Sequence, residues 1–186
     1  MSHGDPGDED SQPITVPDLD LVTAVLAVAA GEIGVHETSR NRGPRVDEYL
    51  RTVGLDPTKG DYPWCAAFLY FCWETAAADL GVPNPCPKSA RALGLWAKAR
   101  PETKIHTFGA EGYVTDPERL RPGAIFVVEH DKGKGHTGLV LGIDHRTREL
   151  ETIEGNSAAD GGREGVAVVR RVRQMPTVNT GYILLG

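Results

Sequence analysis

The segment from Cys65 to Asp79 is apolar almost throughout, and it restricts what this chain can fold into. Its residues are small helix formers or large apolar groups, which predicts a buried helix. Pro63 suits the first turn of such a helix, and Asp61 is a candidate cap just upstream. Gly81 and Pro83 form a stop signal after it. We therefore expect a core helix with a cysteine at its N-terminus.

The position of Cys65 has two interpretations. Helix N-termini carry partial positive charge and free N–H groups, which favour the thiolate, the nucleophilic form of cysteine. Free cysteines are also commonly buried as small apolar residues, and taken alone this is the simpler explanation. The choice depends on whether the rest of the chain supplies a base.

His136 is the best candidate for that base. It stands between glycines at the start of a predicted strand, in the segment Gly133 to Leu141. The segment Arg121 to Val128 reads as a turn and a neighbouring strand, so the histidine is well placed to face a cleft. The other histidines lie in a predicted tail, or in predicted loops and turns without this flanking pattern: His3, His36, His106, His130 and His145.

Glu154 and Asn156 supply a third element. Both fall at the end of a short predicted strand that covers residues 150–153. Either side chain can accept a hydrogen bond from an imidazole N–H, which fixes the ring tautomer and stabilises the imidazolium. An isolated glutamate would be read as an exposed carboxylate, so this element gains weight only with the other two.

The three elements together follow the order of parts in papain-like enzymes: cysteine on a helix, histidine on a strand, then an acid or amide on the next strand. Four short motifs in this order resemble the CHAP family, the cysteine- and histidine-dependent amidohydrolases and peptidases. The motifs are Trp64-Cys65-Ala66-Ala67-Phe68, Pro122-Gly123-Ala124-Ile125, Gly135-His136-Thr137-Gly138-Leu139-Val140 and Glu154-Gly155-Asn156. The resemblance covers roughly residues 30–186.

The resemblance implies a papain-like α+β fold and cleavage of an amide bond in peptidoglycan, as in endolysin-like proteins that degrade the cell wall. It carries over Cys65 as nucleophile, His136 as base, and Glu154 with Asn156 as partners of the histidine. Whether the bond joins sugar to peptide (N-acetylmuramoyl-L-alanine amidase) or peptide to peptide (endopeptidase) is left open.

Acyl transfer by a cysteine also needs oxyanion donors. The backbone N–H of Cys65 is the natural first donor, because it lies at a helix N-terminus. Tyr62 is the candidate for a second donor from its place just before the nucleophile, and Trp64 and Glu37 are further candidates for oxyanion or substrate contacts. A surface position is the simpler interpretation for Glu37.

The coarse path runs from helices to strands. Helices are expected at residues 18–32, 45–53, 65–79 and 89–99, followed by a loop-rich stretch at 100–120. Strands are expected near 124–128, 137–144, 149–154, 165–172 and 181–185. This order predicts a papain-like α+β domain whose N-terminal helices pack on an antiparallel sheet of about five strands. We expect a disordered acidic tail at 1–17 and a single catalytic domain at 18–186.

Composition excludes several classes of function. Six acidic residues in the first 20 match the formal net charge of −6, so the body is balanced and nucleic-acid binding is not expected. The arginines at 170, 171 and 173 read as the solvated face of a strand, with a patch for anionic wall polymers as the alternative. The apolar stretch at 19–30 is too short to cross a bilayer. The chain is expected to be a monomer with peptidoglycan as its partner.

The N-terminus shows no basic region before an apolar core, so no secretory signal peptide is expected. The protein would be made in the cytoplasm and reach the wall after lysis with a holin, by injection, by a secretion machine or by packaging in a phage particle. A toxin role would add an immunity protein as partner.

No cofactor or metal is expected. The three cysteines do not form a disulfide framework: Cys72 reads as core packing, and Cys86 lies in a loop where it can be exposed. No cysteine–histidine spacing indicates zinc. Some relatives bind calcium just before the cysteine, but the loop between Asp56 and Asp61 lacks the alternating acids of a calcium loop.

Two alternatives use the same residues. One is a cysteine peptidase or transglutaminase-like enzyme that acts on protein. The other is an inactive module that binds peptidoglycan through the same groove, against which the intact Cys65, His136 and Glu154 argue.

Overall fold

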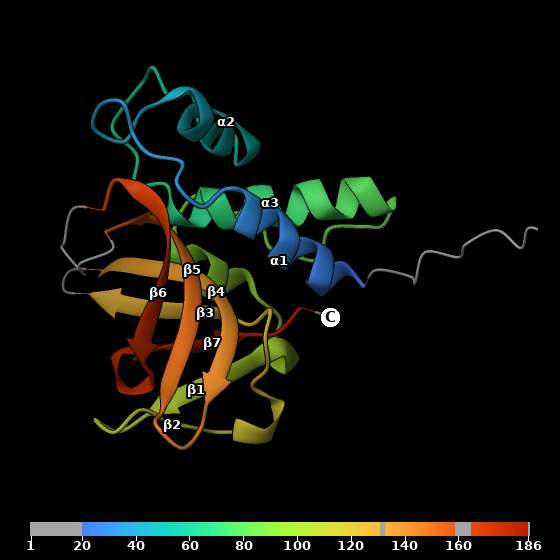
Figure 1. Ribbon diagram of the computed structural model, residues 1–186, viewed down its shortest axis with the longest axis vertical. Helices are drawn as coiled ribbons and strands as arrows, with labels where there is room; N and C mark the ends of the chain where they lie inside the picture. Colours follow the sequence, from blue (N-terminus) through green and yellow to red (C-terminus); the bar gives the residue numbers. More distant parts are fainter. Residues whose placement is uncertain (1–19, 131–132, 159–164, 186) are drawn as a thin grey trace, which may run out of the picture.

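The computed structural model describes residues 20–130, 133–158 and 165–185. The acidic tail predicted at 1–17 lies outside these residues, and the assignment of 18–186 to one catalytic domain stays a prediction. The chain runs through four helices before a strand-rich second half (Figure 1). The helices are α1 (Leu21–Gly31), α2 (Pro44–Thr52), α3 (Cys65–Leu80) and α4 (Ala92–Lys98).

All four predicted helices are present, with boundaries set by local chemistry. Helix α1 begins three residues later than expected, because the Asp20 side chain caps it by accepting a hydrogen bond from the Thr23 backbone N–H at 2.9 Å. Pro44 provides the first turn of α2. Helix α3 ends where the sequence predicted, since Gly81 adopts a left-handed conformation and its N–H bonds carbonyls of the last turn.

The strands form one mixed-length sheet of order β2-β1-β7-β3-β4-β5-β6, in which every pairing is antiparallel. Their bounds are β1 (Lys104–Phe108), β2 (Tyr113–Val114), β3 (Ile125–His130), β4 (Lys134–Asp144), β5 (Glu149–Ser157), β6 (Ala167–Gln174) and β7 (Gly181–Ile183). The described residues also include the short 3₁₀ turns η1 (Pro101–Thr103), η2 (Pro117–Arg119) and η4 (Met175–Thr177). The predicted α+β class is confirmed.

The strand count corrects the prediction of about five strands, because β1 and β2 lie in the stretch expected to be loop. Both are short and half exposed, so they lack the apolar alternation that marks a strand in a sequence. His106 accordingly lies in β1, and His130 ends β3, rather than in loops.

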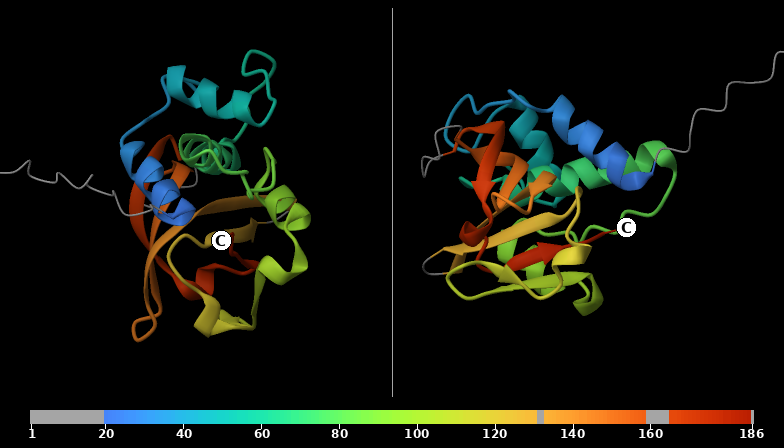
Figure 2. Two further views of the ribbon diagram at one scale, coloured as in Figure 1. Left: turned by 90° about the vertical axis from the view of Figure 1, so that its right-hand side faces the viewer. Right: turned by 60° about the horizontal axis from the view of Figure 1, so that its bottom comes forward.

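The two faces of the sheet carry different cores. Helices α1, α2 and α3 lie together on one side of the sheet (Figures 1 and 2), where α3 packs against α1, α2, β4 and β5. That face contributes Ile125, Val127, Leu139 and Ile153 to the helical core. The opposite face contributes Phe126, Val128, Val140, Leu150 and Tyr182 to a second core. Alternation along each strand therefore separates the two layers.

Helix α3 and strand β5 approach each other very closely at Gly155. A Cβ atom at Gly155 would stand 2.8 Å from the Phe68 side chain, one turn into α3, so only glycine fits between them. This contact brings the first turn of α3 beside the end of β5. In the part of the chain that the structure describes, none of the helices has the length and hydropathy to span a membrane.

Candidate active site

Cys65 is the first residue of α3, directly after the N-cap residue Trp64. Its backbone N–H has no acceptor within the helix and therefore retains the partial positive charge of a helix start. The side chain is almost buried, at 5% exposure. The predicted capping by Asp61 is wrong, because Trp64 occupies the N-cap without a side-chain cap and Asp61 lies three residues further upstream, exposed.

Trp64 is held from the side by Glu37. Its indole Nε1–H donates to Glu37 Oε1 at 2.7 Å, and the backbone N–H of Asn41 donates to the other carboxylate oxygen at 2.8 Å. The indole is fully buried and lies 5.7 Å from the Tyr49 ring. Because Trp64 has no exposed surface and both Glu37 oxygens are occupied, the structure gives these residues a supporting position rather than the substrate-contacting one expected.

His136 lies near the start of β4 and connects the helix to the sheet. Its Nε2 is 2.8 Å from Glu154 Oε2, and the ring lies near enough to the Cys65 side chain to interact with it electrostatically. Since Nε2 faces the carboxylate, the Nδ1 atom is left for the cysteine. Gly138 makes the first contact possible: a Cβ there would lie 2.9 Å from Glu154 Cγ and 2.7 Å from the Phe126 ring.

The pKa of His136 is raised to about 9 by opposing effects. Burial lowers this pKa because it disfavours the charged ring, but the interactions of the ring with Cys65 and Glu154 raise it by more. At neutral pH the ring is therefore an imidazolium. A histidine placed between a cysteine and a carboxylate can serve as the base and acid of a cysteine nucleophile.

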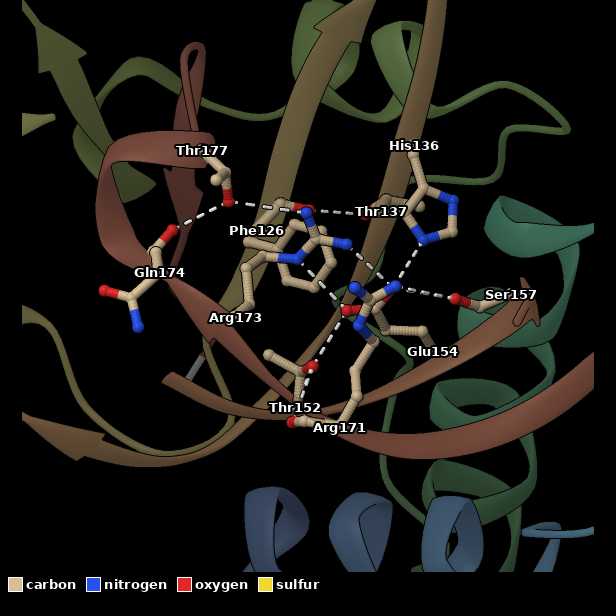
Figure 3. A network of polar contacts seen from close by, with 10 residues as sticks. All are labelled: Phe126, His136, Thr137, Thr152, Glu154, Ser157, Arg171, Arg173, Gln174 and Thr177. Carbon is tan, nitrogen blue, oxygen red and sulfur yellow. Dashed lines mark hydrogen bonds and ion pairs between the residues drawn. The ribbon is translucent and has the colours of Figure 1, made fainter. Parts of the chain in front are cut away.

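Glu154, within β5, is fully buried and surrounded by donors (Figure 3). Its Oε1 accepts from the Thr152 hydroxyl at 2.8 Å, and its Oε2 accepts from the Ser157 hydroxyl at 3.1 Å. Arg173 donates to both oxygens, at 3.1 and 2.9 Å. Burial raises the pKa of Glu154, but His136 and Arg173 lower it by more, so the pKa lies well below its usual range. The carboxylate is thus charged at all ordinary pH values.

Among the described residues, Asn156 makes no hydrogen bond with His136. Oriented to match its neighbours, its amide donates to the Gly165 carbonyl at 2.5 Å and accepts from the Trp64 backbone N–H at 3.3 Å. The expectation that it partners the histidine is corrected: Asn156, with a positive φ of 52°, links the end of β5 to the peptide before Cys65.

The arginines of β6 also differ from the prediction of a solvated face. Only Arg170 fits it, as it pairs with Glu151 at the surface. Arg171 and Arg173 turn to the other side, opposite Thr152 and Leu150 in the register, and both approach Glu154. Sequence reasoning missed Arg173, Thr152 and Ser157. The spacing of Thr152 and Glu154 along one strand was a usable signal, whereas nothing local pointed to Arg173.

Comparison with known protein families gives one match that bears on this arrangement. The family model for the CHAP domain matches residues 57–156, more than half of the chain. The chain belongs to the CHAP domain family. The match includes Cys65, His136, Glu154 and Asn156, while Glu37 and Arg173 lie outside it. Searches of curated proteins and of solved structures gave no match.

CHAP domains are generally cysteine- and histidine-dependent amidohydrolases or peptidases, so the family supports hydrolase-type chemistry here. The other two cysteines of this CHAP domain are not part of the arrangement. Cys72 is fully buried, as expected, and Cys86, whose exposure the sequence left open, is buried too. Both are free thiols, and burial raises the pKa of each.

The remaining candidate, Tyr62, makes no hydrogen bond to Cys65 or His136 among the described residues. Its ring folds over Gly60, whose Cβ position lies 3.0 Å from the ring. The role of Tyr62 as an oxyanion donor stays a prediction.

In the described loop before the cysteine, the side chains do not form a set of oxygen ligands that would match a calcium site. Asp56 is exposed and accepts hydrogen bonds within its own loop from the Thr58 backbone and hydroxyl, at 2.9 and 2.7 Å. Among the described residues, no three side chains of His, Cys, Asp or Glu gather as metal ligands. The CHAP domain's independence of a cofactor stays a prediction.

Proposed function

We propose that this protein is a peptidoglycan hydrolase that cleaves an amide bond with Cys65 as nucleophile and His136 as base and acid. The observation that carries the proposal is the hydrogen bond between His136 and the buried Glu154 carboxylate, on a ring that interacts with Cys65 at the start of α3. Glu154 orients the ring and stabilises its charge, as the acidic member of a catalytic triad does.

The first half of the reaction is acyl transfer to the cysteine. The Cys65 sulfur attacks the amide carbonyl carbon, and a C–S bond forms as the carbonyl oxygen takes up negative charge. The backbone N–H of Cys65 donates to this oxyanion, with Tyr62 as the candidate second donor. When the tetrahedral species collapses, the C–N bond breaks and His136 gives its proton to the departing amine.

The second half is hydrolysis of the thioester. His136, now neutral, takes a proton from a water molecule, and the resulting hydroxide adds to the acyl carbon. The C–S bond then breaks, which releases the carboxylic acid and returns the sulfur and the imidazolium to their starting states. No redox step and no additional reactant is required.

The substrate assignment follows from the family and is proposed at the level of peptidoglycan. Both amide classes in that polymer are candidates: the bond between the sugar lactyl group and the first amino acid, and bonds within the peptides. Delivery to the wall by lysis, injection or non-classical export, and a holin, secretion machine or immunity protein as partner, belong to the same proposal.

The test is mass spectrometry of purified peptidoglycan after digestion with wild type, Cys65→Ala and Cys86→Ala. Cys86→Ala is the matched control, because it removes a buried thiol that lies outside the arrangement of Cys65, His136 and Glu154. We expect new fragments from wild type and from the control, and none from Cys65→Ala.

The fragment masses decide the bond class, since an amidase releases free peptides and an endopeptidase leaves peptides attached to sugar. Fragments from Cys65→Ala at the wild-type rate would refute a cysteine mechanism. An intact wall with all three proteins, across several wall types, would refute peptidoglycan as the substrate and favour a protein substrate or a binding role.

A further inference from the structure

The side of Glu154 that does not face His136 is covered by Arg173, on strand β6. Arg173 Nε donates to Oε1 at 3.1 Å and Nη2 donates to Oε2 at 2.9 Å. This two-point contact matches the planar fork of a guanidinium to a carboxylate. The Arg173 side chain is only 13% exposed, so water competes little for either group.

Arg173 is itself held firmly in place. Its guanidinium carbon lies 4.7 Å from the centre of the Phe126 ring, and its Nη1 is 3.5 Å from the Thr177 hydroxyl (Figure 3). That hydroxyl in turn donates to the Gln174 carbonyl at 2.7 Å. The aromatic face and the turn η4 therefore fix the guanidinium, and the guanidinium fixes the carboxylate.

As a result, each carboxylate oxygen of Glu154 accepts hydrogen bonds from more than one donor. Oε2 accepts from His136, Ser157 and Arg173, and Oε1 accepts from Thr152 and Arg173. A carboxylate bound in this way cannot rotate away from the imidazole. Its negative charge is also shared between two cations, so His136 experiences only part of it.

Arg171 offers an internal comparison on the same strand. Its Nη1 is 3.9 Å from Glu154 Oε2 and 3.5 Å from the Ser157 hydroxyl, and its buried Nε has no partner among the described residues. Arg171 adds positive charge near Glu154 without a two-point contact. The geometry of the carboxylate is therefore set by Arg173.

We propose that Arg173 is a positioning residue of this site, which holds Glu154 against His136 and, by sharing the charge of the carboxylate, limits how strongly the imidazolium retains its proton. Its effect on hydrolysis rests on the function proposed above, whereas its effect on His136 does not. A purely structural ion pair would stabilise the fold without changing the titration of His136.

The first experiment follows the titration of His136 by NMR of the histidine ring signals, in wild type, Arg173→Gln and Arg173→Lys. The His136 signal is identified by its absence from the His136→Gln spectrum. We expect Arg173→Gln to raise the pKa of His136 by about half a unit to one unit, because a competing cation is removed. Arg173→Lys keeps the charge and should shift it by less than about 0.3 units.

The matched control is Arg170→Gln, on the same strand. Arg170 is paired with Glu151 at the surface and does not touch Glu154, so its removal should leave both the titration and the activity unchanged. Thermal melting of every variant shows whether the fold is intact.

The second experiment is a double-mutant cycle in kcat/KM on peptidoglycan. We expect Arg173→Gln to lower kcat/KM about tenfold when Glu154 is present, and less than about twofold in the Glu154→Gln background, because Arg173 acts through that carboxylate. If Arg173→Gln does not fold, the same cycle with Arg173→Lys tests the loss of the two-point contact, which should again vanish without Glu154.

The outcomes separate the two proposals. An unmoved or lowered pKa of His136 in Arg173→Gln, or equal losses of kcat/KM with and without Glu154, would overturn the role of Arg173. A raised pKa of His136 in a protein that leaves every peptidoglycan intact would support that role and overturn the proposed function instead.

Discussion

Two buried glutamates, Glu154 and Glu32, are each held by an arginine, and they differ in the third partner. Glu32 accepts hydrogen bonds from Arg45, at 2.9 Å through Nε, and from the Tyr49 hydroxyl, and so joins the end of α1 to α2. Glu154 accepts from Arg173 and from His136. The Tyr49 phenol has its pKa raised by burial and by Glu32, so nothing in the first cluster changes charge near neutral pH.

The comparison teaches that a carboxylate–guanidinium pair is not a functional feature by itself. Beside a phenol it ties two helices together. Beside an imidazole that lies near a cysteine, the same pair influences the charge state of a group that can move protons. The third partner, rather than the ion pair, separates the scaffold from the site.

The largest effect should come from removing that third partner in each cluster. We expect His136→Gln to lower kcat/KM on peptidoglycan by about 10³-fold or more, because the proton donor and acceptor is lost. Tyr49→Phe removes one buried hydrogen bond, so it should cost about 1–2 kcal/mol of unfolding free energy and leave kcat/KM within about twofold. Steady-state kinetics and urea unfolding measure both. Similar kinetic losses in the two variants would break the comparison.

The next effect tests Glu154 directly. Glu154→Gln should lower kcat/KM about 100-fold, because the ring loses the charge that orients and stabilises it. Removal of this carboxylate also lowers the pKa of His136 from about 9 toward 6.5. Activity that depends on the imidazolium falls as pH rises through that pKa, so the alkaline limb of the pH–rate profile should move to lower pH. An alkaline limb that stays in place would show that another group controls it.

A smaller effect is expected at Glu32, and on stability alone. Glu32→Gln should cost about 2 kcal/mol of unfolding free energy and leave kcat/KM unchanged. The cost is smaller than for a fully buried ion pair, because the Arg45 side chain is 41% exposed. The hydrogen bond from Arg45 lowers the pKa of Glu32 despite burial. A lowered pKa stabilises the fold above about pH 4.5 and loses this effect as pH falls. Wild type should therefore lose stability on acidification more steeply than Glu32→Gln.

The smallest effect concerns Glu37, a carboxylate with neither an arginine nor a histidine. Glu37→Ala removes the acceptor of the Trp64 indole and should lower kcat/KM about fivefold, through looser placement of Cys65. Glu37→Gln keeps an acceptor oxygen and should be within about twofold of wild type. If the glutamine variant were as impaired as the alanine variant, the charge of Glu37 would matter and its role would be closer to that of Glu154.

The sequence was most informative where the determinants are local. The stop at Gly81 and Pro83, and the start of α3 at Cys65, follow from residues adjacent in the chain. The sequence did not predict strands β1 and β2, because short, half-exposed strands show little hydrophobic periodicity. These strands are defined instead by the pairing of β1 with β2 and with β7. The prediction that Asp61 caps α3 was also wrong, because the helix begins only after Pro63 and Trp64, too far along the chain for the Asp61 side chain to be its N-cap.

The sequence allowed the residues of the site that lie in local motifs to be predicted, but not the contacts that depend on strand pairing. Cysteine, histidine and glutamate could be named from motif order, and the structure brings Cys65, His136 and Glu154 together. Arg173 and the true partner of Asn156 depend on strand register and on the approach of α3 to β5. Such contacts join residues far apart in sequence, so a single chain read by pattern does not disclose them.

The complete burial of Glu154 has a consequence for how this protein would respond to its surroundings. Dissolved ions screen charges at the surface over about 8 Å at physiological ionic strength, but they do not enter a site without exposed surface. Because Glu154 has no exposed surface and Arg173 is only 13% exposed, the Glu154 contacts to His136 and Arg173 should weaken far less with added salt than surface ion pairs do. Any dependence of the rate on salt would then report how the protein meets a charged wall polymer, and not how the bond is cut.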